Sequence, residues 1–348
     1  MTDLPRGYVA MTQALQRRAA ARRQPVNAMF ELTARCNLGC EMCYVRQPAN
    51  DRTHRAAELS AADWVALARE ATDNGLIFLL LTGGEVFLRR DFFQIYEPLT
   101  RMGLILTLFT NGTRITDRIA RRLAEAPPQQ TRITLYGASP AMYGAVTGVP
   151  GAFERCCAGI EALLRHGVPL ELTTTITRRN RGDLEAMRRM ARGWGLPLSA
   201  NWLLMQRRDR APCGAEGCRL SAEDCAALAA AERPAPPAET GTRSAANFAC
   251  HVGKSSFAVT SCGEMLPCLN LDAPAIGLRE TGFRTAWARL QAAIDASAPE
   301  DPRCQTCAAR GACPRCPAWS MTETGRLTGP VPYLCDMMKA RATPEPAA

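Results

Sequence analysis

Short apolar runs alternate with amphipathic helical patterns from Val26 onward, and this alternation limits the fold more than any other feature. It is typical of repeated βα units that build a parallel sheet. Crossovers of this kind give either an open doubly wound sheet or a full or partial barrel, so we expect an α/β fold. In both architectures the chemistry lies at the C-terminal ends of the strands.

The apolar runs and the helical spacing place the expected elements. We expect strands over residues 28–33, 77–82, 104–110, 132–136, 170–176 and 197–205. We expect helices over residues 117–126, 152–166 and 183–194. A further helix should begin with a capping box of Ser60 and Asp63 and bury the apolar residues at helical spacing, Trp64, Leu67, Ala68 and Ala71.

The chain has 16 cysteines among its 348 residues. It contains no apolar run long enough to cross a membrane, and residues near its N-terminus lack the apolar stretch of a secretory signal. We therefore expect a cytoplasmic protein that does not bind a membrane. Because cytoplasmic thiols are kept reduced, metal ligation explains the cysteines better than disulfide bonds do.

The formal net charge is +9, and the Lys and Arg residues are spread along the chain. A moderately basic surface favours an acidic peptide or a reduced flavodoxin or ferredoxin as a partner. Nucleic acid is not expected as a partner, because the sequence lacks aromatic residues interleaved with the basic ones. An arginine-rich proteome would explain the charge equally well.

Three cysteines, Cys36, Cys40 and Cys43, directly follow the first expected strand, where a barrel would bind its substrate. Three thiolates on one tight loop cannot complete a zinc site with four ligands, but they can hold a [4Fe–4S] cluster with one iron left open. The alternative is that these cysteines pack as small apolar side chains, although the residues around them are polar.

This CxxxCxxC motif, followed by LTGGE at the end of the second strand, resembles the radical S-adenosylmethionine (SAM) superfamily over residues 26–205. The resemblance implies a partial (β/α)6 TIM-like barrel, with a SAM-binding [4Fe–4S] cluster on the three cysteines. It also implies that Gly83, Gly84 and Glu85 contact the methionine amino group of SAM. Glycines allow close backbone approach, and a carboxylate neutralises an ammonium group. Members often have an aromatic residue where Met42 stands here.

The resemblance implies further SAM contacts at the ends of later strands. These are Asn111 of the TNG sequence, Ser139, Thr175, and main-chain groups near Leu204 and Met205. For each of them the alternative is an ordinary polar group of a loop.

A second set of seven cysteines lies near the C-terminus and resembles the SPASM extension of radical SAM enzymes over residues 246–340. That extension binds two auxiliary [4Fe–4S] clusters. Carried over by position, one cluster would be held by Cys304, Cys307, Cys313 and Cys335, and the other by Cys250, Cys268 and Cys316. Two residues separate Cys313 from Cys316, where the family usually has three.

The fourth ligand of the second auxiliary cluster is open. Some members have a cysteine at the position of Ser244, so this cluster would either keep an open iron or use Cys262 or one of the nearby thiols, Cys213, Cys218 and Cys225. The competing interpretation is that the two CxxC pairs bind zinc. It would leave Cys250, Cys268 and Cys335 without a role.

The domain organisation follows from these patterns. We expect a basic N-terminal segment over residues 1–25, the barrel over 26–205, a bridging or linker segment rich in charges and prolines over 206–245, the SPASM domain over 246–340 and a tail over 341–348. Within the SPASM domain, residues 255–268 predict a β-hairpin that turns near Cys262 and Gly263. Residues 285–294 predict a short helix. The remaining part has few apolar residues, so metal should stabilise it.

The resemblance implies an enzyme that reductively cleaves SAM to a 5′-deoxyadenosyl radical and abstracts a hydrogen atom from its substrate. Enzymes with this extension commonly modify peptides, so the leading substrate is a ribosomally synthesised precursor that receives a thioether or carbon–carbon crosslink. Residues 1–25 are too few for a leader-recognition domain, so a separate leader-recognition protein is expected.

Three alternatives remain. A sulfatase-type maturase would oxidise Cys or Ser, but such enzymes place an Asp directly after the cysteine that matches Cys268, where Leu269 and Asn270 stand here. A dehydrogenase of a small sugar or aminocyclitol is the second. An iron–sulfur electron carrier is a non-enzymatic third, which the GGE motif disfavours because a carrier needs no methionine-binding strand end.

Overall fold

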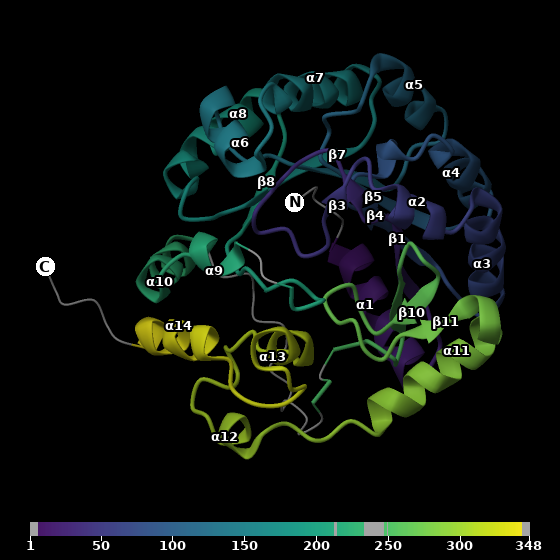
Figure 1. Cartoon of the computed structure of the whole chain (residues 1–348), viewed down its shortest axis with the longest axis vertical. Coiled ribbons are helices and arrows are strands. Elements are labelled where there is room, and N and C mark those ends of the chain that lie inside the picture. Colours follow the sequence, from purple (N-terminus) through teal and green to yellow (C-terminus); the bar gives the residue numbers. More distant parts are fainter. Residues whose placement is uncertain (1–5, 212–213, 233–246, 249, 343–348) are drawn as a thin grey trace, which may run out of the picture.

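A computed structural model describes residues 6–211, 214–232, 247–248 and 250–342 of the chain. Cys213 and Ser244, and with them part of the expected linker, lie outside the described residues, as do both ends of the chain. Within them, the fold is built on a nine-stranded sheet in the order β11-β10-β9-β1-β4-β5-β6-β7-β8 (Figure 1).

Six parallel strands of this sheet lie side by side in sequence order. They are β1 (Asn27–Thr33), β4 (Phe78–Gly83), β5 (Ile105–Thr110), β6 (Gln130–Thr134), β7 (Leu170–Thr175) and β8 (Leu198–Asn201). A doubly wound sheet reverses its strand order at a switch point, whereas a barrel does not. The uninterrupted order therefore confirms the barrel-like alternative of the α/β prediction.

Most strand bounds agree with the expectation to within one residue, with two exceptions. β6 begins at Gln130 and ends at Thr134, so Tyr136 lies beyond the strand. β8 ends at Asn201, and Leu204 and Met205 lie in the segment that follows it. The expectation was wrong here because an apolar run continues past the strand into residues that face a cavity rather than a neighbouring strand.

Helices cover the outside of the curved sheet (Figure 1). They are α3 (Ala61–Asp73), α4 (Phe92–Thr100), α5 (Asp117–Glu125), α6 (Pro140–Thr147), α7 (Ala152–Arg165) and α8 (Leu184–Gly193). The predicted capping box is present, since Ser60 accepts a hydrogen bond from the Asp63 amide and the Asp63 carboxylate accepts one from the Ser60 amide. Trp64 of α3 is fully buried, with its ring centroid 4.9 Å from that of Phe30 on β1.

The C-terminal part of the chain extends the same sheet. β9 (Ser256–Val259) pairs in parallel with β1, and β10 (Glu264–Leu266) and β11 (Ile276–Gly277) continue beyond it. The predicted hairpin is confirmed, and its turn contains Gly263 at a φ of +90°. The helix that follows, α11 (Leu278–Asp295), is longer than expected. It packs on β9 through Phe283, whose ring centroid lies 5.3 Å from that of Phe257.

The expected linker contains two helices that the sequence analysis did not predict, α9 (Ala215–Cys218) and α10 (Ala222–Ala231). α10 packs against α14 (Pro332–Ala342), and the Cys225 thiol lies 3.4 Å from the Tyr333 hydroxyl. α12 (Pro302–Gln305) and α13 (Pro317–Thr324) complete this region. Alanines of high helix propensity and the Ser221 cap explain α10, which the neighbouring prolines obscure in the sequence.

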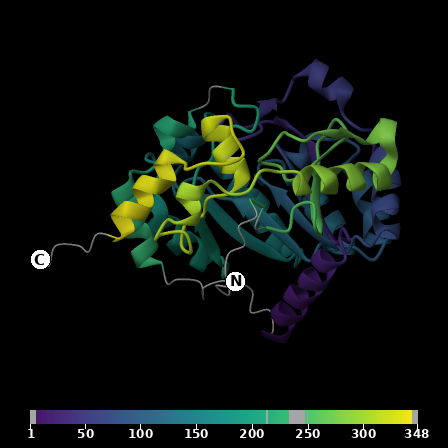
Figure 2. The same cartoon turned by 90° about the horizontal axis from the view of Figure 1, so that it is seen from below.

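The remaining elements lie at the start of the chain and in the loops. α1 (Arg6–Ala21) projects from the body of the molecule (Figure 2). The short elements are β2 (Arg35–Cys36), β3 (Gln47–Pro48), α2 (Arg52–Ala57) and the 3₁₀ turns η1 (Val86–Leu88) and η2 (Arg181–Asp183). Among the residues that the structure describes, no helix combines the length and the apolar character needed to cross a bilayer.

Candidate active site

A cavity of about 670 Å³ lies at the carboxyl ends of the barrel strands. Cys36, Cys40 and Cys43 all line it, and so do Cys268 and Asn270 of the C-terminal region. Its other walls come from the strand ends and the segment after β8, including Thr82, Asn111, Thr134, Tyr136, Thr173, Thr175, Asn201 and Met205. One cavity therefore joins the two cysteine-rich parts of the chain.

The cysteine loop is fixed by the ends of neighbouring strands. Cys36 lies at the end of β2, where its sulfur accepts hydrogen bonds from the Leu38 amide at 3.4 Å and from Asn111 Nδ2 at 3.7 Å. Asn111 Nδ2 also donates to Asn37 Oδ1 at 3.1 Å, which ties the loop to the end of β5. The Tyr136 hydroxyl forms a hydrogen bond with the Cys40 thiol. Donors aimed at the sulfurs stabilise thiolates more than thiols.

Burial dominates the protonation of these three cysteines. It raises the pKa of Cys36 and of Cys40 to about 12, and it also raises the pKa of Cys43, against backbone hydrogen bonds from Val45 and Arg46 that lower it. Without a metal the three groups are therefore neutral thiols at neutral pH. Any metal that binds here must displace their protons, which couples metal binding to pH.

The two glycines of LTGGE are required by the packing of the first two barrel strands. Gly83 has a φ of +147°, and a Cβ placed on it would lie 2.2 Å from the Thr33 carbonyl oxygen. A Cβ on Gly84 would lie 2.4 Å from the Arg35 carbonyl oxygen. Both residues line the cavity, so their main chain is accessible to a ligand there.

Glu85 lies behind the cavity wall rather than on it. Its carboxylate is buried and accepts hydrogen bonds from Thr110 Oγ1 at 2.8 Å, from the Asn111 amide at 2.8 Å and from the Phe87 amide at 3.1 Å. Burial raises its pKa, while these donors lower it in part. In the structure Glu85 therefore holds the end of β5, and its contact with SAM stays a prediction.

The other predicted SAM contacts divide into two groups. Asn111, Thr175 and Met205 line the cavity. Ser139 does not line it, and its hydroxyl caps α6 by accepting a hydrogen bond from the Met142 amide at 3.3 Å. In the structure Ser139 therefore caps a helix, and its contact with SAM stays a prediction.

The structure brings the C-terminal cysteines together in two groups, and their role as cluster ligands stays a prediction. A cavity of about 460 Å³ is lined by Cys304, Cys307, Cys313 and Cys335, together with apolar residues of α14. In the other group, Cys250 and Cys316 lie close enough to Cys268 to oppose its ionisation, although burial is the main reason that its pKa is raised to about 12. Cys268 also lines the cavity at the strand ends.

The cysteines considered as a fourth ligand for the group of Cys250, Cys268 and Cys316 have other neighbours in the structure. Burial raises the pKa of Cys262, and the nearby carboxylates of Glu264, Glu31 and Glu58 raise it further. Cys218 forms a hydrogen bond with Glu41, and Cys225 contacts Tyr333. Cys213 lies outside the described residues.

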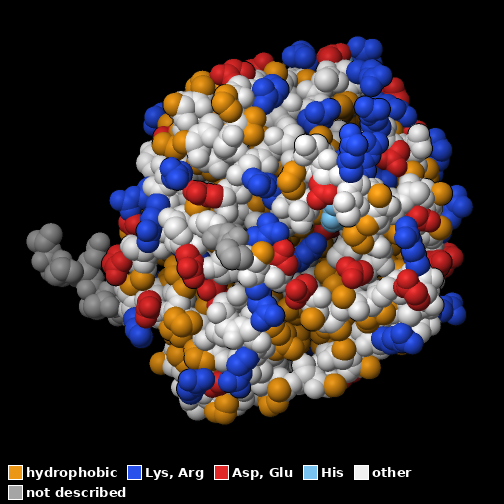
Figure 3. Space-filling model, viewed as in Figure 1, with side chains coloured by type: hydrophobic (Ala, Val, Ile, Leu, Met, Phe, Trp, Pro, Cys, Tyr) orange, Lys and Arg blue, Asp and Glu red, His pale blue; other side chains and the backbone are white. Residues whose placement is uncertain are grey.

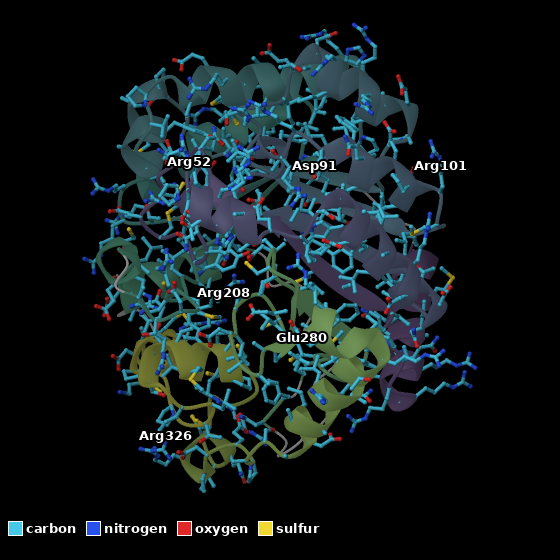
Figure 4. All side chains as sticks on the ribbon, turned by 45° about the vertical axis from the view of Figure 1, so that its right-hand side comes forward. Arg52, Asp91, Arg101, Arg208, Glu280 and Arg326 are labelled. Atoms are coloured by element: carbon cyan, nitrogen blue, oxygen red, sulfur yellow. The ribbon has the colours of Figure 1, made fainter. Side chains whose placement is uncertain are left out.

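Sequence reasoning missed a buried ion pair beside the cavity. Glu31 of β1 is fully buried, and its two oxygens accept hydrogen bonds from the Arg208 guanidinium at 2.8 Å each. Arg208 lies where the barrel meets the C-terminal region (Figure 4). The glutamate in the otherwise apolar run AMFELT was the available signal, because a buried carboxylate needs a partner.

The cavity fits a three-thiolate cluster and SAM in its donor set. Three sulfurs face one space, amide donors point at two of them, and the remaining wall offers hydroxyl, amide and main-chain groups to a polar ligand. In the described parts of the chain, no three Cys, His, Asp or Glu side chains converge closely enough to hold a single metal ion.

The chain is similar to two kinds of characterised protein. It is 27% identical over 336 residues to an AdoMet-dependent heme synthase of Methanosarcina barkeri, which covers 87% of this chain and 94% of that protein. It is 26% identical over 333 residues to a PqqA peptide cyclase of Rhizobium meliloti, which covers 88% of this chain and 86% of that protein.

A solved structure confirms the fold. SuiB of Streptococcus suis, bound to its precursor peptide SuiA, superposes with a TM-score of 0.69 at 16% identity, covering 92% of this chain and 79% of that one. Residues 30–191 match the sequence model of the radical SAM superfamily. Residues 30–191 of the chain are therefore a radical SAM domain.

Proposed function

We propose that this enzyme oxidatively modifies a peptide and forms a thioether or carbon–carbon crosslink in a ribosomally synthesised precursor. One observation carries the proposal: a single cavity is bounded by Cys36, Cys40 and Cys43 on one side and by the loop of Cys268 on the other. A side chain held there lies between the SAM-binding end of the barrel and the C-terminal thiols.

Cys36, Cys40 and Cys43 would hold a [4Fe–4S] cluster, and Gly83, Gly84 and the strand ends would hold SAM. When bound, these groups supply a 5′-deoxyadenosyl radical that removes a hydrogen atom from the substrate. The chain's own contribution is to position the substrate and to exclude water. Apolar side chains below the strand ends, Leu80 and Phe109 among them, line the cavity and keep solvent away from the reacting carbon.

The two C-terminal cysteine groups would hold auxiliary [4Fe–4S] clusters. The group of Cys304, Cys307, Cys313 and Cys335 supplies four thiolates. The group of Cys250, Cys268 and Cys316 supplies three, which leaves a position where a substrate thiolate can bind. Zinc is the competing occupant, and iron and sulfide analysis after anaerobic reconstitution distinguishes the two.

A peptide suits the cavity better than a large ring system. About 670 Å³ must accommodate both SAM and the reacting part of the substrate, which leaves room for a side chain rather than for a tetrapyrrole. The similarity to PqqA peptide cyclase and the fold of SuiB, solved with a precursor peptide, support this choice. The similarity to AdoMet-dependent heme synthase makes tetrapyrrole modification the second candidate.

Co-expression tests the substrate directly. The enzyme is produced with each short reading frame that neighbours its gene, with and without a separate leader-recognition protein, and the peptides are analysed by mass spectrometry. Each crosslink should remove two hydrogen atoms from the peptide, and a Cys36→Ala variant should leave the mass unchanged. Unmodified peptides, together with SAM-dependent consumption of a tetrapyrrole, would transfer the assignment to the second candidate.

A further inference from the structure

A second cavity, of about 530 Å³, opens on the outer side of the barrel. It lies between η1, α4 and α5. Three phenylalanines, Phe87, Phe92 and Phe93, form an aromatic part of its lining, and five arginines surround it, Arg89, Arg90, Arg114, Arg118 and Arg122. The space-filling view shows basic side chains gathered toward this side of the molecule, at the upper right (Figure 3).

Two of these arginines are neutralised within the fold. Arg89 is buried and pairs with Asp91 at 2.7 Å, and Asp91 lies on the loop before α4 (Figure 4). Arg122 pairs with Glu97 at 2.7 Å, and its guanidinium lies 4.2 Å from the ring centroid of Phe93. Both therefore stabilise the fold and add little free positive charge to the cavity.

The other three arginines are exposed and add net positive charge. Arg114 donates a hydrogen bond to the Phe87 carbonyl oxygen at 3.3 Å. Arg90 and Arg118 have no carboxylate partner among the residues that the structure describes. Arg90 also borders an adjoining hollow of about 310 Å³, whose carboxylates, Glu58 and Asp91, pair with Arg35 and Arg89. The exposed Arg55 in its lining therefore extends the positive surface beyond one cavity.

This surface lies directly behind the first cysteine loop. The loop between β5 and α5 carries Arg114 on the side of the arginine cavity. On its other side, Asn111 Nδ2 donates to the Cys36 sulfur at 3.7 Å, and Thr113 Oγ1 accepts from Asn37 Nδ2 at 2.8 Å. A single loop thus separates the arginine cavity from the Cys36 thiol.

We propose that the arginine cavity is the docking site of a small acidic electron-carrier protein of the flavodoxin or ferredoxin type. The inference rests on the proposed function, which needs one electron from outside. The carrier's reduced cofactor would lose one electron, and the [4Fe–4S] cluster that Cys36, Cys40 and Cys43 would hold would gain it, with no bond formed and no proton moved. Positive charge spread over two hollows steers an acidic surface toward its docking position.

The position of the cavity also leaves the substrate side free. α4 and α5 lie at the upper right of Figure 1, whereas α13 and α14 lie at the lower left. Trp319 of α13 lines the cavity of the three cysteines, whereas the arginine cavity is lined from η1, α4 and α5. A carrier docked on the arginine cavity therefore does not occupy the cavity in which the peptide would react.

Charge reversal tests the site. The variant Arg90→Glu/Arg118→Glu is compared with Arg192→Glu/Arg289→Glu, which makes the same change in net charge at exposed positions on α8 and α11. Binding of an acidic flavodoxin to the full-length, reconstituted protein is measured by calorimetry. We expect the first variant to bind about tenfold more weakly or worse, the second to bind within about twofold of the wild type, and the wild-type affinity to fall with added salt. Equal binding by all three proteins, or equal weakening in both variants, would overturn the proposal.

The source of electrons separates this inference from the proposed function. With dithionite, both variants should form 5′-deoxyadenosine at the wild-type rate; with reduced flavodoxin, only Arg90→Glu/Arg118→Glu should be slow. A variant that is equally slow with dithionite would show a general defect and contradict docking. If the wild type forms no product with dithionite, the proposed function fails, while the flavodoxin affinities still decide where the carrier binds.

Discussion

The two cysteine-rich regions of the molecule are built in different ways. Cys36, Cys40 and Cys43 follow a central strand, and the ends of neighbouring strands hold their loop through Asn111 and Tyr136. The cysteines around the 460 Å³ cavity instead lie on short helices and loops, and Cys307 is exposed. The barrel thus positions its thiols through hydrogen bonds from ordered strand ends, whereas the C-terminal region has less support of this kind, and we expect a bound metal to stabilise it more than the barrel.

A network of buried charged and polar side chains around Glu300 helps to hold the C-terminal region together. Glu300 is buried and pairs with Arg315 at 2.8 Å and with Arg310 at 2.9 Å. Arg315 also donates to Ser320 Oγ at 3.0 Å, which joins α13 to the residues that precede it. In this region these charge pairs add to the apolar packing of Trp319, Val331 and Leu334.

The largest expected effect comes from the first cysteine loop. Replacing Cys36, Cys40 and Cys43 together by Ala removes all three ligands from the cavity. Formation of 5′-deoxyadenosine with dithionite should fall by about a thousandfold or more, to background, because a [4Fe–4S] cluster cannot be held without its thiolates. Auxiliary iron should remain, and the control Cys157→Ala should be fully active. Product formation by the triple variant would contradict the site assignment.

Removing Glu300 should have the next largest effect. In Glu300→Gln the buried Arg315 guanidinium loses its carboxylate, which we expect to destabilise the protein by about 3 kcal/mol. Urea unfolding of the reconstituted protein measures this, and retained iron gives a second readout. The control Asp336→Asn removes an exposed pair with Lys339 and should change stability by about 0.5 kcal/mol or less. Similar losses in the free energy of unfolding for both variants would show that the Glu300 network does not stabilise this region.

Removal of metal tests the comparison itself. After chelation, hydrogen exchange of backbone amides in residues 302–335 should become about a hundredfold faster, because the binding free energy of the metal is lost there. Exchange in β1, β4 and β5 should change much less. Equal acceleration in both regions would mean that the barrel also requires its metal to fold.

The smallest effect is expected at a single hydrogen bond. Asn111→Ala removes the side-chain donor to the Cys36 sulfur and should slow SAM cleavage about tenfold, since a hydrogen bond to a charged group is worth about 1.5 kcal/mol. The exposed Asn50→Ala serves as the control. An unchanged rate would show that Leu38 and the other strand ends suffice to position the loop.

Sequence reasoning predicted the barrel well because its signals are local. Strand runs such as 77–82 and the Ser60 capping box depend on residues close together in the chain. The parallel pairing of β9 with β1 joins residues 256–259 to 27–30, and no local pattern records such a contact. α10 and α14 were missed for a related reason, since they stabilise each other across more than a hundred residues.

In the candidate site, too, local motifs were predicted and contacts between distant residues were not. The resemblance to radical SAM enzymes and their SPASM extension grouped the cysteines that line the two cavities. It could not tell that Ser139 caps a helix or that Glu85 lies behind the wall, because a motif does not record which polar groups already satisfy each other inside the fold. The Glu31–Arg208 pair likewise needed the fold to bring β1 and the segment after β8 together.

The central claim is that three thiolates and the strand ends form one site that binds and cleaves SAM. The most direct measurement is equilibrium binding of SAM to oxygen-free, reconstituted wild-type protein, followed by product analysis after dithionite is added. We predict saturable binding and equal amounts of methionine and 5′-deoxyadenosine. Protein that carries its iron and sulfide, yet neither binds SAM nor consumes it when reduced, would contradict the account.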